Sequence, residues 1–393
     1  MWTLLQRRTS VLLIVVVTLH MIWPSQAAQG GPLSSVAASD YFHHHDADLL
    51  NELFNDDSTT PPPPPESLLR FPIGTATGVG SAPYAEWAHY HWVWLSNDRA
   101  SQAAMTEYAA EYRNRSIRVG AVNMDSRWET GFNNFKFNSK YPNVTGMVEH
   151  FHGEDVRVIF WITSMVDVDS DNYQDGDKHG YFIKDLLGKS ALMSWWHGRG
   201  SLLDYSNPDA VKWWHEQMDK ALSTGIDGWK CDGTDPYILE VVDARGHSGH
   251  VSYRNYADHY YGDFFDHTRA VRGKDALIMS RPVDVFGPLF FRFSPKRVMF
   301  SGWVGDADPT FSGLISTLKR YLQSAWDGYA NFGSDIGGYR TGNGTLGRTK
   351  ELFIRWAQLG AFSPLMENGG DKEHRPWMFD SDGSTLIEDT YRE

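Results

Sequence analysis

The stretch Gly228-Trp-Lys-Cys-Asp232 is a short, mostly apolar run that ends in a charged residue. An amphipathic segment precedes it at Asp209–Leu222, and another follows it at Tyr256–Val271, both with apolar residues at helical spacing. A strand between two helices pairs in parallel with its neighbours through right-handed crossovers. The stretch therefore predicts one unit of an α/β fold.

The same alternation continues in both directions from this stretch. Helical segments are also predicted at Ser101–Arg113, Phe311–Trp326 and Thr349–Leu359. Eight such units predict a (β/α)8 barrel, the TIM barrel, over residues 86–393, with a doubly wound open sheet as the alternative. No glycine-rich phosphate-binding fingerprint opens the first unit, which favours the barrel. The eight predicted strands are His89–Leu95, Ile117–Met124, Val156–Ser164, Gly228–Asp232, Ala276–Arg281, Val298–Val304, Ala330–Ser334 and Phe362–Met366.

The residues before the barrel are predicted to have two other roles. Arg7 and Arg8 precede an apolar run at 11–23, and small residues follow, which is typical of a cleaved signal peptide over residues 1–27. The run is shorter than the roughly 20 residues that a membrane span needs. Residues 28–85 include Pro61–Pro65 and predict a disordered linker. His43-His-His-Asp46 within it is interpreted as a solvated loop, because zinc ligands are usually spaced along ordered elements.

The composition limits the classes of function. The formal charge of −13 argues against a protein that coats nucleic acid, because such surfaces are basic. The single cysteine, Cys231, excludes an intramolecular disulfide and a cysteine-rich zinc module. We expect a secreted or lumenal protein with no membrane partner after signal cleavage. In that compartment Asn114, Asn143 and Asn343 become candidate N-glycosylation sites.

Charged residues gather where the predicted strands end. In a (β/α)8 barrel the C-terminal strand ends carry the chemistry. One Asp at such an end is equally consistent with a cap on the next helix. Several carboxylates that point towards one end of a barrel repel one another, so together they indicate a site that uses them. The residues at or just past these ends are Asp125, Asp232, Asp235, Arg281, Asp306 and Asp335.

Longer segments around these residues carry a family resemblance. Residues 225–237 read Gly-Ile-Asp-Gly-Trp-Lys-Cys-Asp-Gly-Thr-Asp-Pro-Tyr, and residues 301–310 read Ser-Gly-Trp-Val-Gly-Asp-Ala-Asp-Pro-Thr. Together with Gly333-Ser-Asp-Ile-Gly-Gly-Tyr339 and the segment 351–364, they resemble the catalytic barrel of glycoside hydrolase family 31. Its members are retaining α-glycosidases, mostly α-glucosidases, α-xylosidases and α-galactosidases. The resemblance implies a carbohydrate substrate and no metal or organic cofactor.

The resemblance implies roles for the two central carboxyl groups. Asp232 corresponds to the family's nucleophile and Asp306 to its general acid/base, while Lys230 corresponds to a lysine of the xylosidase-like members. The chemistry itself requires one ionised and one protonated carboxyl group on either side of the anomeric carbon. Lys230 beside Asp232 favours the charged nucleophile, and we expect neighbouring carboxylates to raise the pKa of Asp306.

Other residues are expected to bind the sugar. By resemblance, Asp335 and Asp125 hold hydroxyls of the sugar in the first subsite, and the arginine upstream of the acid/base is either Arg281 or Arg297. The spacing leaves both arginines open. Tryptophans are candidates for walls that stack on sugar faces, with plain core packing as the alternative for each. These are Trp94, Trp128, Trp161, Trp229 and Trp303.

The chain also departs from the family pattern. Asp235 stands where many members have a glutamate, and Gly369 stands where many have a histidine after Arg-Asn. Candidates to replace that histidine are Glu367, Asn368, Glu373 and His374. The linker takes the place of the family's N-terminal β-sandwich, and the chain is expected to stop after the eighth strand without the usual final helix. A minimal barrel, a C-terminally truncated product and an inactive relative all fit this pattern.

The leading hypothesis is a retaining α-glycosidase that hydrolyses terminal α-glycosidic bonds through a covalent glycosyl-enzyme. One alternative is an α-galactosidase of a related barrel family, which shares the Lys-x-Asp strand end. The other is a non-catalytic glycan-binding relative, against which the intact pair of Asp232 and Asp306 argues.

Overall fold

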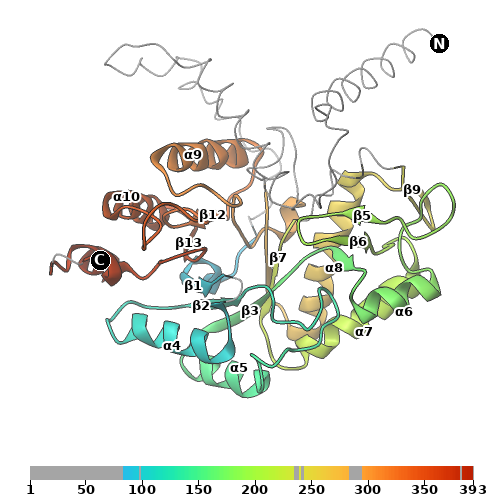
Figure 1. Cartoon of the computed structure of the whole chain (residues 1–393), viewed down its shortest axis with the longest axis horizontal. Coiled ribbons are helices and arrows are strands. Elements are labelled where there is room, and N and C mark those ends of the chain that lie inside the picture. Colours follow the sequence, from blue (N-terminus) through green and yellow to red (C-terminus); the bar gives the residue numbers. More distant parts are fainter. Residues whose placement is uncertain are drawn as a thin grey trace, which may run out of the picture. The chain divides into compact units, whose positions relative to one another are not determined.

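The computed structural model describes residues 83–96, 99–233, 239, 243–282, 294–380 and 383–392. The predicted signal peptide and almost all of the predicted linker lie outside the described residues. The residues described belong to one unit, Ala76–Glu393, in which strands lie at the centre and helices surround them (Figure 1).

Eight parallel strands form one sheet that closes on itself. The hydrogen-bonded order is β11-β10-β7-β3-β2-β1-β13-β12, and a parallel bridge from Trp303, just after β11, to Gly333 of β12 joins the two edges. The predicted (β/α)8 barrel is therefore confirmed, and the open sheet is excluded. The strands are β1 (His91–Leu95), β2 (Ala121–Met124), β3 (Arg157–Ile162), β7 (Gly228–Cys231), β10 (Leu277–Ser280), β11 (Ser301–Gly302), β12 (Gly333–Asp335) and β13 (Leu365–Asn368).

The helices begin where the sequence offers a capping side chain. The Ser101, Asn143 and Asn207 side chains, for example, accept hydrogen bonds from backbone N–H groups in the first turns of α4, α5 and α7. None of the helices described is long and apolar enough to cross a membrane. The helices around the barrel are α4 (Gln102–Arg113), α5 (Val144–Gly153), α7 (Pro208–Leu222), α8 (Tyr253–Arg272), α9 (Phe311–Trp326) and α10 (Lys350–Ala361).

Smaller elements decorate the barrel. After β3 the chain forms a three-stranded antiparallel sheet in the order β4-β6-β5. A second, two-stranded ribbon precedes α8. These elements are β4 (Met165–Asp167), α6 (Asp171–His179), β5 (Met193–Ser194), β6 (Arg199–Leu202), β8 (Arg245–Gly246) and β9 (Gly249–His250), with short 3-10 helices at η1 (Glu86–His89), η4 (Lys296–Val298) and η5 (Pro376–Phe379).

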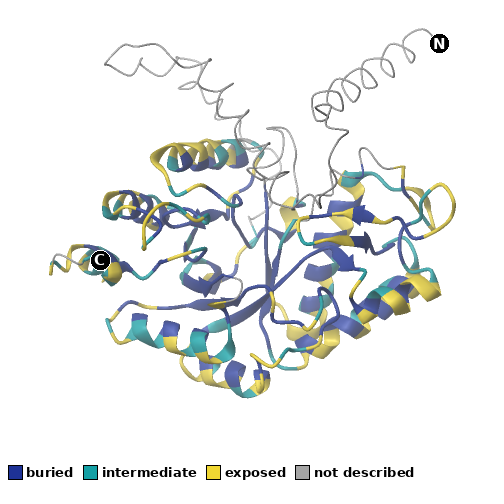
Figure 2. Ribbon diagram, in the orientation of Figure 1, coloured by how far each residue is buried: buried dark blue, intermediate teal, exposed yellow. Residues whose placement is uncertain are grey.

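Alternate residues of the strands face two different apolar layers. Trp92, Leu277 and Leu365 belong to a cluster built from several strands, and this cluster fills the inside of the ring. Val93 and Trp229 belong to the cluster that also holds helix residues. Figure 2 shows the strands buried and the outer helix faces exposed. Because side chains alternate along a strand, the next inward positions towards the C-terminal strand ends are occupied by Trp94, Asn123, Trp161, Lys230, Trp303, Asp335 and Glu367.

The end of the barrel differs from the prediction in two respects that bear on the site. The eighth strand begins at Leu365 and not at Phe362, because Phe362 caps the end of α10 and is 93% exposed. Glu367 thereby lies inside the strand and on its inward face. The expectation of no helix after the eighth strand is wrong, since α11 (Leu386–Arg392) follows it and buries Ile387.

Candidate active site

Asp232 follows β7 directly and is held by groups from three neighbouring elements. The indole Nε1 of Trp161 donates a 3.0 Å hydrogen bond to its Oδ2, and the Arg281 guanidinium lies 2.6 Å from its Oδ1. The Tyr260 hydroxyl of α8 donates to its backbone carbonyl. The carboxylate is thus fixed in direction and paired with a cation, yet its side chain stays 21% exposed. Such a carboxylate is suited to attack as an ion.

Asp306 lies on the other side of the same arginine. Nη2 of Arg281 is 3.5 Å from its Oδ1, so one guanidinium nitrogen contacts both carboxyl groups. Burial raises the pKa of Asp306 above its ordinary value, with Arg281 opposing the rise and Asp232 adding to it. Gly305, with φ of +90°, makes the turn that directs the chain from β11 to this residue. When the environments of two adjacent carboxyl groups set their pKa values apart, the group with the higher pKa can act as the acid and the other as the nucleophile.

Lys230 brings a buried cation into the barrel. Its Nζ lies 3.8 Å from the centre of the Trp94 ring and 4.6 Å from that of Trp303. Burial alone would lower the pKa of Lys230, but the surrounding carboxyl groups, Asp335 first and Glu367 second, raise it above its ordinary value. Lys230 is therefore charged, and it offsets part of the negative charge around it.

Several buried polar groups on the inward face have no hydrogen-bond partner among the described residues. They include both oxygens of Asp335 and of Glu367, which are 2% and 0% exposed. The indole nitrogen of Trp94 and both side-chain polar atoms of Asn123 share this property. Burial raises the pKa of Asp335 well above its ordinary value and that of Glu367 to about 7. Unpaired buried polar groups are costly, so their concentration here indicates a place for a ligand.

Most of the residues predicted for the site come together. Asp125 is buried at the end of β2 and contributes to the pKa shifts of Lys230, Asp335 and Glu367, so it belongs to the same group. The predicted residues that the barrel brings together are Asp125, Trp161, Lys230, Asp232, Arg281, Trp303, Asp306, Asp335 and Glu367.

One predicted residue does not join this group, and another lies outside the described residues. The Arg297 side chain is 54% exposed on η4 and forms two 2.8 Å hydrogen bonds with Asp266 of α8. The structure therefore favours Arg281 as the arginine of the site. Asp235 lies outside the described residues.

The tryptophans divide between site and core. Trp94, Trp161 and Trp303 face inward beside Lys230 or Asp232. Trp229 faces the helices, where its Nε1 donates to Thr268 of α8, and Trp128 packs among buried aromatic rings. The last two are core residues.

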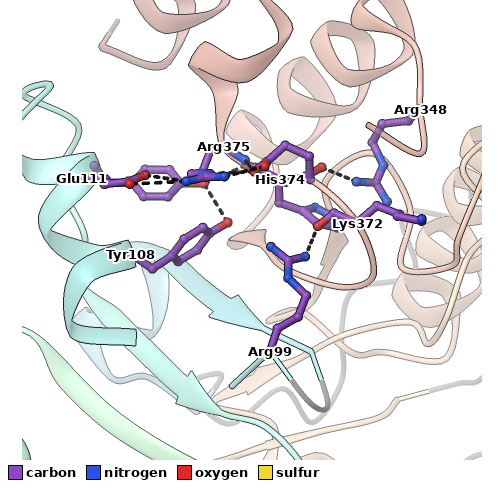
Figure 3. A network of polar contacts seen from close by, with 9 residues as sticks. Arg99, Tyr108, Glu111, Arg348, Lys372, His374 and Arg375 are labelled. Carbon is purple, nitrogen blue, oxygen red and sulfur yellow. Dashed lines mark hydrogen bonds and ion pairs between the residues drawn. The ribbon is translucent and has the colours of Figure 1, made fainter. Parts of the chain in front are cut away.

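Three of the four candidates to replace the family histidine contact one another in a separate network, and Figure 3 shows the part of it around His374. There Arg375 bonds to Glu373 and to Glu111 of α4, and His374 is buried with both ring nitrogens near backbone carbonyls. Asn368 donates to the backbone carbonyl of His374 and to Tyr391. Of the four, only Glu367 faces the interior of the barrel.

A tryptophan occupies the space beside Gly369. A Cβ atom at this position would lie 1.8 Å from Nε1 of Trp94, so any larger residue would displace the indole. The space that a side chain at position 369 would need is thus filled by Trp94 of β1. The two residues are far apart in the sequence, so no local pattern could indicate this contact.

Sequence reasoning missed Asn123. It lies two residues before Asp125 on β2, with a buried and unpartnered amide. The alternation of inward positions along a strand was the signal that could have found it. Among the described residues, no group of three or more His, Cys, Asp or Glu side chains is arranged to hold a metal ion.

Comparison with known proteins places this site in a family. A family model described as the glycosyl hydrolases family 31 TIM-barrel domain matches residues 82–392. An α-xylosidase of Emericella nidulans is 24% identical over 310 residues, which are 77% of this chain and 38% of the relative. A sulfoquinovosidase of Escherichia coli is 26% identical over 264 residues, 64% of this chain and 37% of the relative.

A solved structure has the same barrel fold. The family 31 dextranase of Flavobacterium johnsoniae, complexed with glucose, superposes with a TM-score of 0.68 at 21% identity, covering 79% of this chain and 39% of that one. The chain thus spans less than two fifths of the length of these relatives.

Proposed function

The chain belongs to glycoside hydrolase family 31, and on that premise we propose that it is a retaining α-glycosidase acting on terminal α-glycosidic bonds. One observation carries the proposal. A single guanidinium, that of Arg281, contacts two carboxyl groups at the C-terminal end of the barrel, and burial raises the pKa of one of them, Asp306.

The chemistry follows from this asymmetry. An oxygen of Asp232 attacks the anomeric carbon while the bond to the leaving oxygen breaks, and Asp306 gives its proton to that oxygen. A water molecule then attacks the glycosyl-enzyme, Asp306 takes its proton, and Asp232 leaves. Two inversions at one carbon return the original configuration. In such enzymes the two carboxyl groups stand roughly 5–5.5 Å apart, which suits a pair that shares one guanidinium.

The hydrogen bonds of Asp232 support its role as nucleophile. Trp161 and Arg281 hold its two oxygens, so the attacking atom is oriented before the substrate arrives. Positioning of this kind removes part of the entropic barrier to attack. The partial exposure of Asp232 and Asp306, at 21% and 26% of their side chains, leaves them accessible.

A panel of aryl α-glycosides tests the proposal. We expect hydrolysis of at least one, with the α-anomer as the first sugar seen by proton NMR, and no hydrolysis by the Asp232→Ala variant. Release of the β-anomer would exclude retention. Galactosides belong in the panel, although membership in family 31 excludes the related α-galactosidase family as the chain's own.

Glycan binding without catalysis is the second candidate function. Measurable sugar binding without turnover on any glycoside would favour it. The pair of carboxyl groups argues against it, because a binding protein does not need two carboxyl groups that share one arginine while burial raises the pKa of one of them, Asp306.

We also propose that the protein passes through the secretory pathway. The apolar run at 11–23 supports this, as does the exposure of all three candidate glycosylation sites, Asn114, Asn143 and Asn343. Expression in a secreting eukaryotic cell tests it. We expect protein in the medium whose mobility shifts after glycosidase treatment, and retention in the cytosol would contradict the proposal.

A further inference from the structure

Two histidine rings stack between the outer helices α7 and α8. The rings of His215 and His267 have centroids 3.8 Å apart and an angle of 12° between their planes. Nε2 of His215 lies 2.8 Å from Oδ1 of Asp263, and Nε2 of His267 lies 2.7 Å from Oδ1 of Asp219. Each helix thus supplies one histidine and one aspartate, and both hydrogen bonds cross to the other helix. We call these four residues the helix-pair quartet.

The quartet uses one sequence spacing twice. His215 and Asp219 are four residues apart on α7, and Asp263 and His267 are four residues apart on α8 in the opposite order. Residues four apart lie on the same face of a helix. The partners in each hydrogen bond are separated by 48 residues, so the two helices meet in a parallel register. This register pairs each histidine with a carboxylate and places the two rings between the pairs.

The hydrogen bonds determine where a proton can be added. A carboxylate can only accept, so Nε2 of each histidine carries a hydrogen and donates it, and Nδ1 takes up the next proton. The partner of His215 gains most from this proton. The Asp263 side chain is 17% exposed, and its Oδ2 is buried without a hydrogen-bond partner among the described residues. A carboxylate with so little solvation is stabilised when its partner becomes a cation.

The groups nearest to His215 act in both directions. Burial alone would lower the pKa of His215, but its hydrogen bond to Asp263 and the charges of Asp263 and Asp219 raise it above its ordinary value. Lys212 lies one turn earlier on α7, and its charge opposes a proton on His215. Because the two rings stack, a charge on His267 also opposes it. The quartet therefore takes up one proton more readily than two.

Other titratable groups lie on the elements around the quartet. Asp266 of α8 is paired with Arg297 of η4 through two hydrogen bonds. Tyr205 and Tyr256 lie near Asp263 and are neutral, because burial raises the pKa of each well above its ordinary value. His259 lies one turn before Asp263 on α8, with its ring stacked on Tyr205. On the side of α6, Asp175 accepts a hydrogen bond from Trp213 and pairs with His179.

We propose that the helix-pair quartet is a pH-dependent clamp, which holds α7 to α8 more strongly in mildly acidic surroundings. One added proton turns the bond from His215 to Asp263 into a bond between two charges, which is roughly twice as strong as a neutral one. The folded state binds this proton more tightly than the unfolded chain does. The contribution to stability is therefore complete at low pH and is lost as the pH rises through the raised pKa of His215. The clamp needs no substrate, so it goes beyond the proposed function.

Urea unfolding of the full chain at pH 8 and pH 6 tests the clamp. His215→Gln keeps a side-chain donor for Asp263 but takes up no proton in this range. From pH 8 to pH 6 we expect the unfolding equilibrium constant of the wild type to fall about fivefold more than that of the variant. His150→Gln is the matched control, because His150 pairs at the surface with Glu154, one turn along the chain, and should keep the wild-type difference.

A second variant covers the case in which His215→Gln does not fold. Asp219→Asn changes a side chain that is 51% exposed and removes one of the two negative charges that favour the proton. The difference between pH 8 and pH 6 should then be smaller than in the wild type. A wild-type difference in His215→Gln, or in Asp219→Asn if only that variant folds, would overturn the proposal. An equal loss in His150→Gln would overturn it too, since the difference would then belong to histidines in general.

Discussion

Two glutamates six residues apart have opposite environments. Glu373 accepts hydrogen bonds from Arg375 and from backbone N–H groups of the chain that follows β13. Glu367, inside β13, has two oxygens without a hydrogen-bond partner among the described residues. Burial alone would raise the pKa of both, but Arg375 brings the pKa of Glu373 below its ordinary value, whereas that of Glu367 rises to about 7.

The two environments indicate different roles. Around Glu373, charged groups are paired and hold loops together, as when Arg348 donates to the backbone carbonyl of Glu373 (Figure 3). Arg348 also donates to the carbonyls of Gly337 and Gly338. Around Glu367, polar groups are buried and left unpaired. A protein maintains such a costly arrangement where a ligand completes it. The inward face of the barrel is therefore a site, and the network beyond it is scaffold.

The largest expected effect lies on the inward face. Asp232→Ala should lower kcat/KM at least about a thousandfold on every substrate, because no nucleophile remains. Asp263→Ala is the matched control, since that residue pairs with His215 on the outer helices. Steady-state kinetics on the same aryl glycoside measures both. If both variants lost activity to a similar extent, the special role of Asp232 on the inward face would be contradicted.

Asp306 should show a smaller effect that depends on the leaving group. Asp306→Ala should lose about a hundredfold or more on sugar or alkyl leaving groups, within the range of general acid catalysis, and much less on activated aryl groups. An activated leaving group departs with little protonation. Equal losses in both classes would remove Asp306 from the acid role.

Removal of the buried carboxyl group of Asp335, which we expect to bind a sugar hydroxyl, should cost less again. Asp335→Ala should lower kcat/KM at least about tenfold, because a buried hydrogen bond to the sugar is lost and 1.4 kcal/mol is a factor of ten. On the deoxy-sugar substrate that lacks the bound hydroxyl, the mutation should cost little more. A loss that is the same on every deoxy substrate and that follows a fall in Tm would make Asp335 structural.

The pH dependence is the smallest of these effects. Because Asp306 must be protonated to act and burial raises its pKa, activity should fall as the pH rises through that raised pKa. A glycosyl fluoride needs little acid assistance, so with this substrate the alkaline decline should weaken. An unchanged profile would assign the decline to another group, such as Glu367.

Much of the barrel could be predicted because its signals are local. Eight apolar runs between amphipathic segments indicate the fold, and strand-end carboxylates such as Asp232 and Asp306 indicate the site. The remaining features depend on packing between distant segments. Spacing could not choose between Arg281 and Arg297, since only the folded barrel sets Arg281 between two carboxyl groups.

The eighth strand shows how a small shift hides a residue. With the strand predicted to end at Met366, Glu367 stood past its end, whereas the strand of the structure includes it on the inward face. The space beside Gly369 is filled by Trp94 from β1, at the other end of the barrel sequence. No local pattern records that contact.

Unfolding at pH 8 of the variants Glu367→Gln and Glu373→Gln tests the central claim most directly. The pKa of Glu367 is raised from 4.5 to about 7, so its favourable contribution is present at low pH and lost as the pH rises through 7. Its charge costs on the order of 3 kcal/mol at pH 8, since one pKa unit is about 1.4 kcal/mol. The lowered pKa of Glu373 means that its contribution is present at pH 8 and is lost only in acid.

We therefore expect opposite signs in urea unfolding at pH 8. Glu367→Gln should raise the free energy of unfolding while catalytic efficiency falls, and Glu373→Gln should lower it by about 1–3 kcal/mol. If both variants lose stability to a similar extent, Glu367 is part of the scaffold, and the claim that the inward face is held unpaired for a substrate is contradicted.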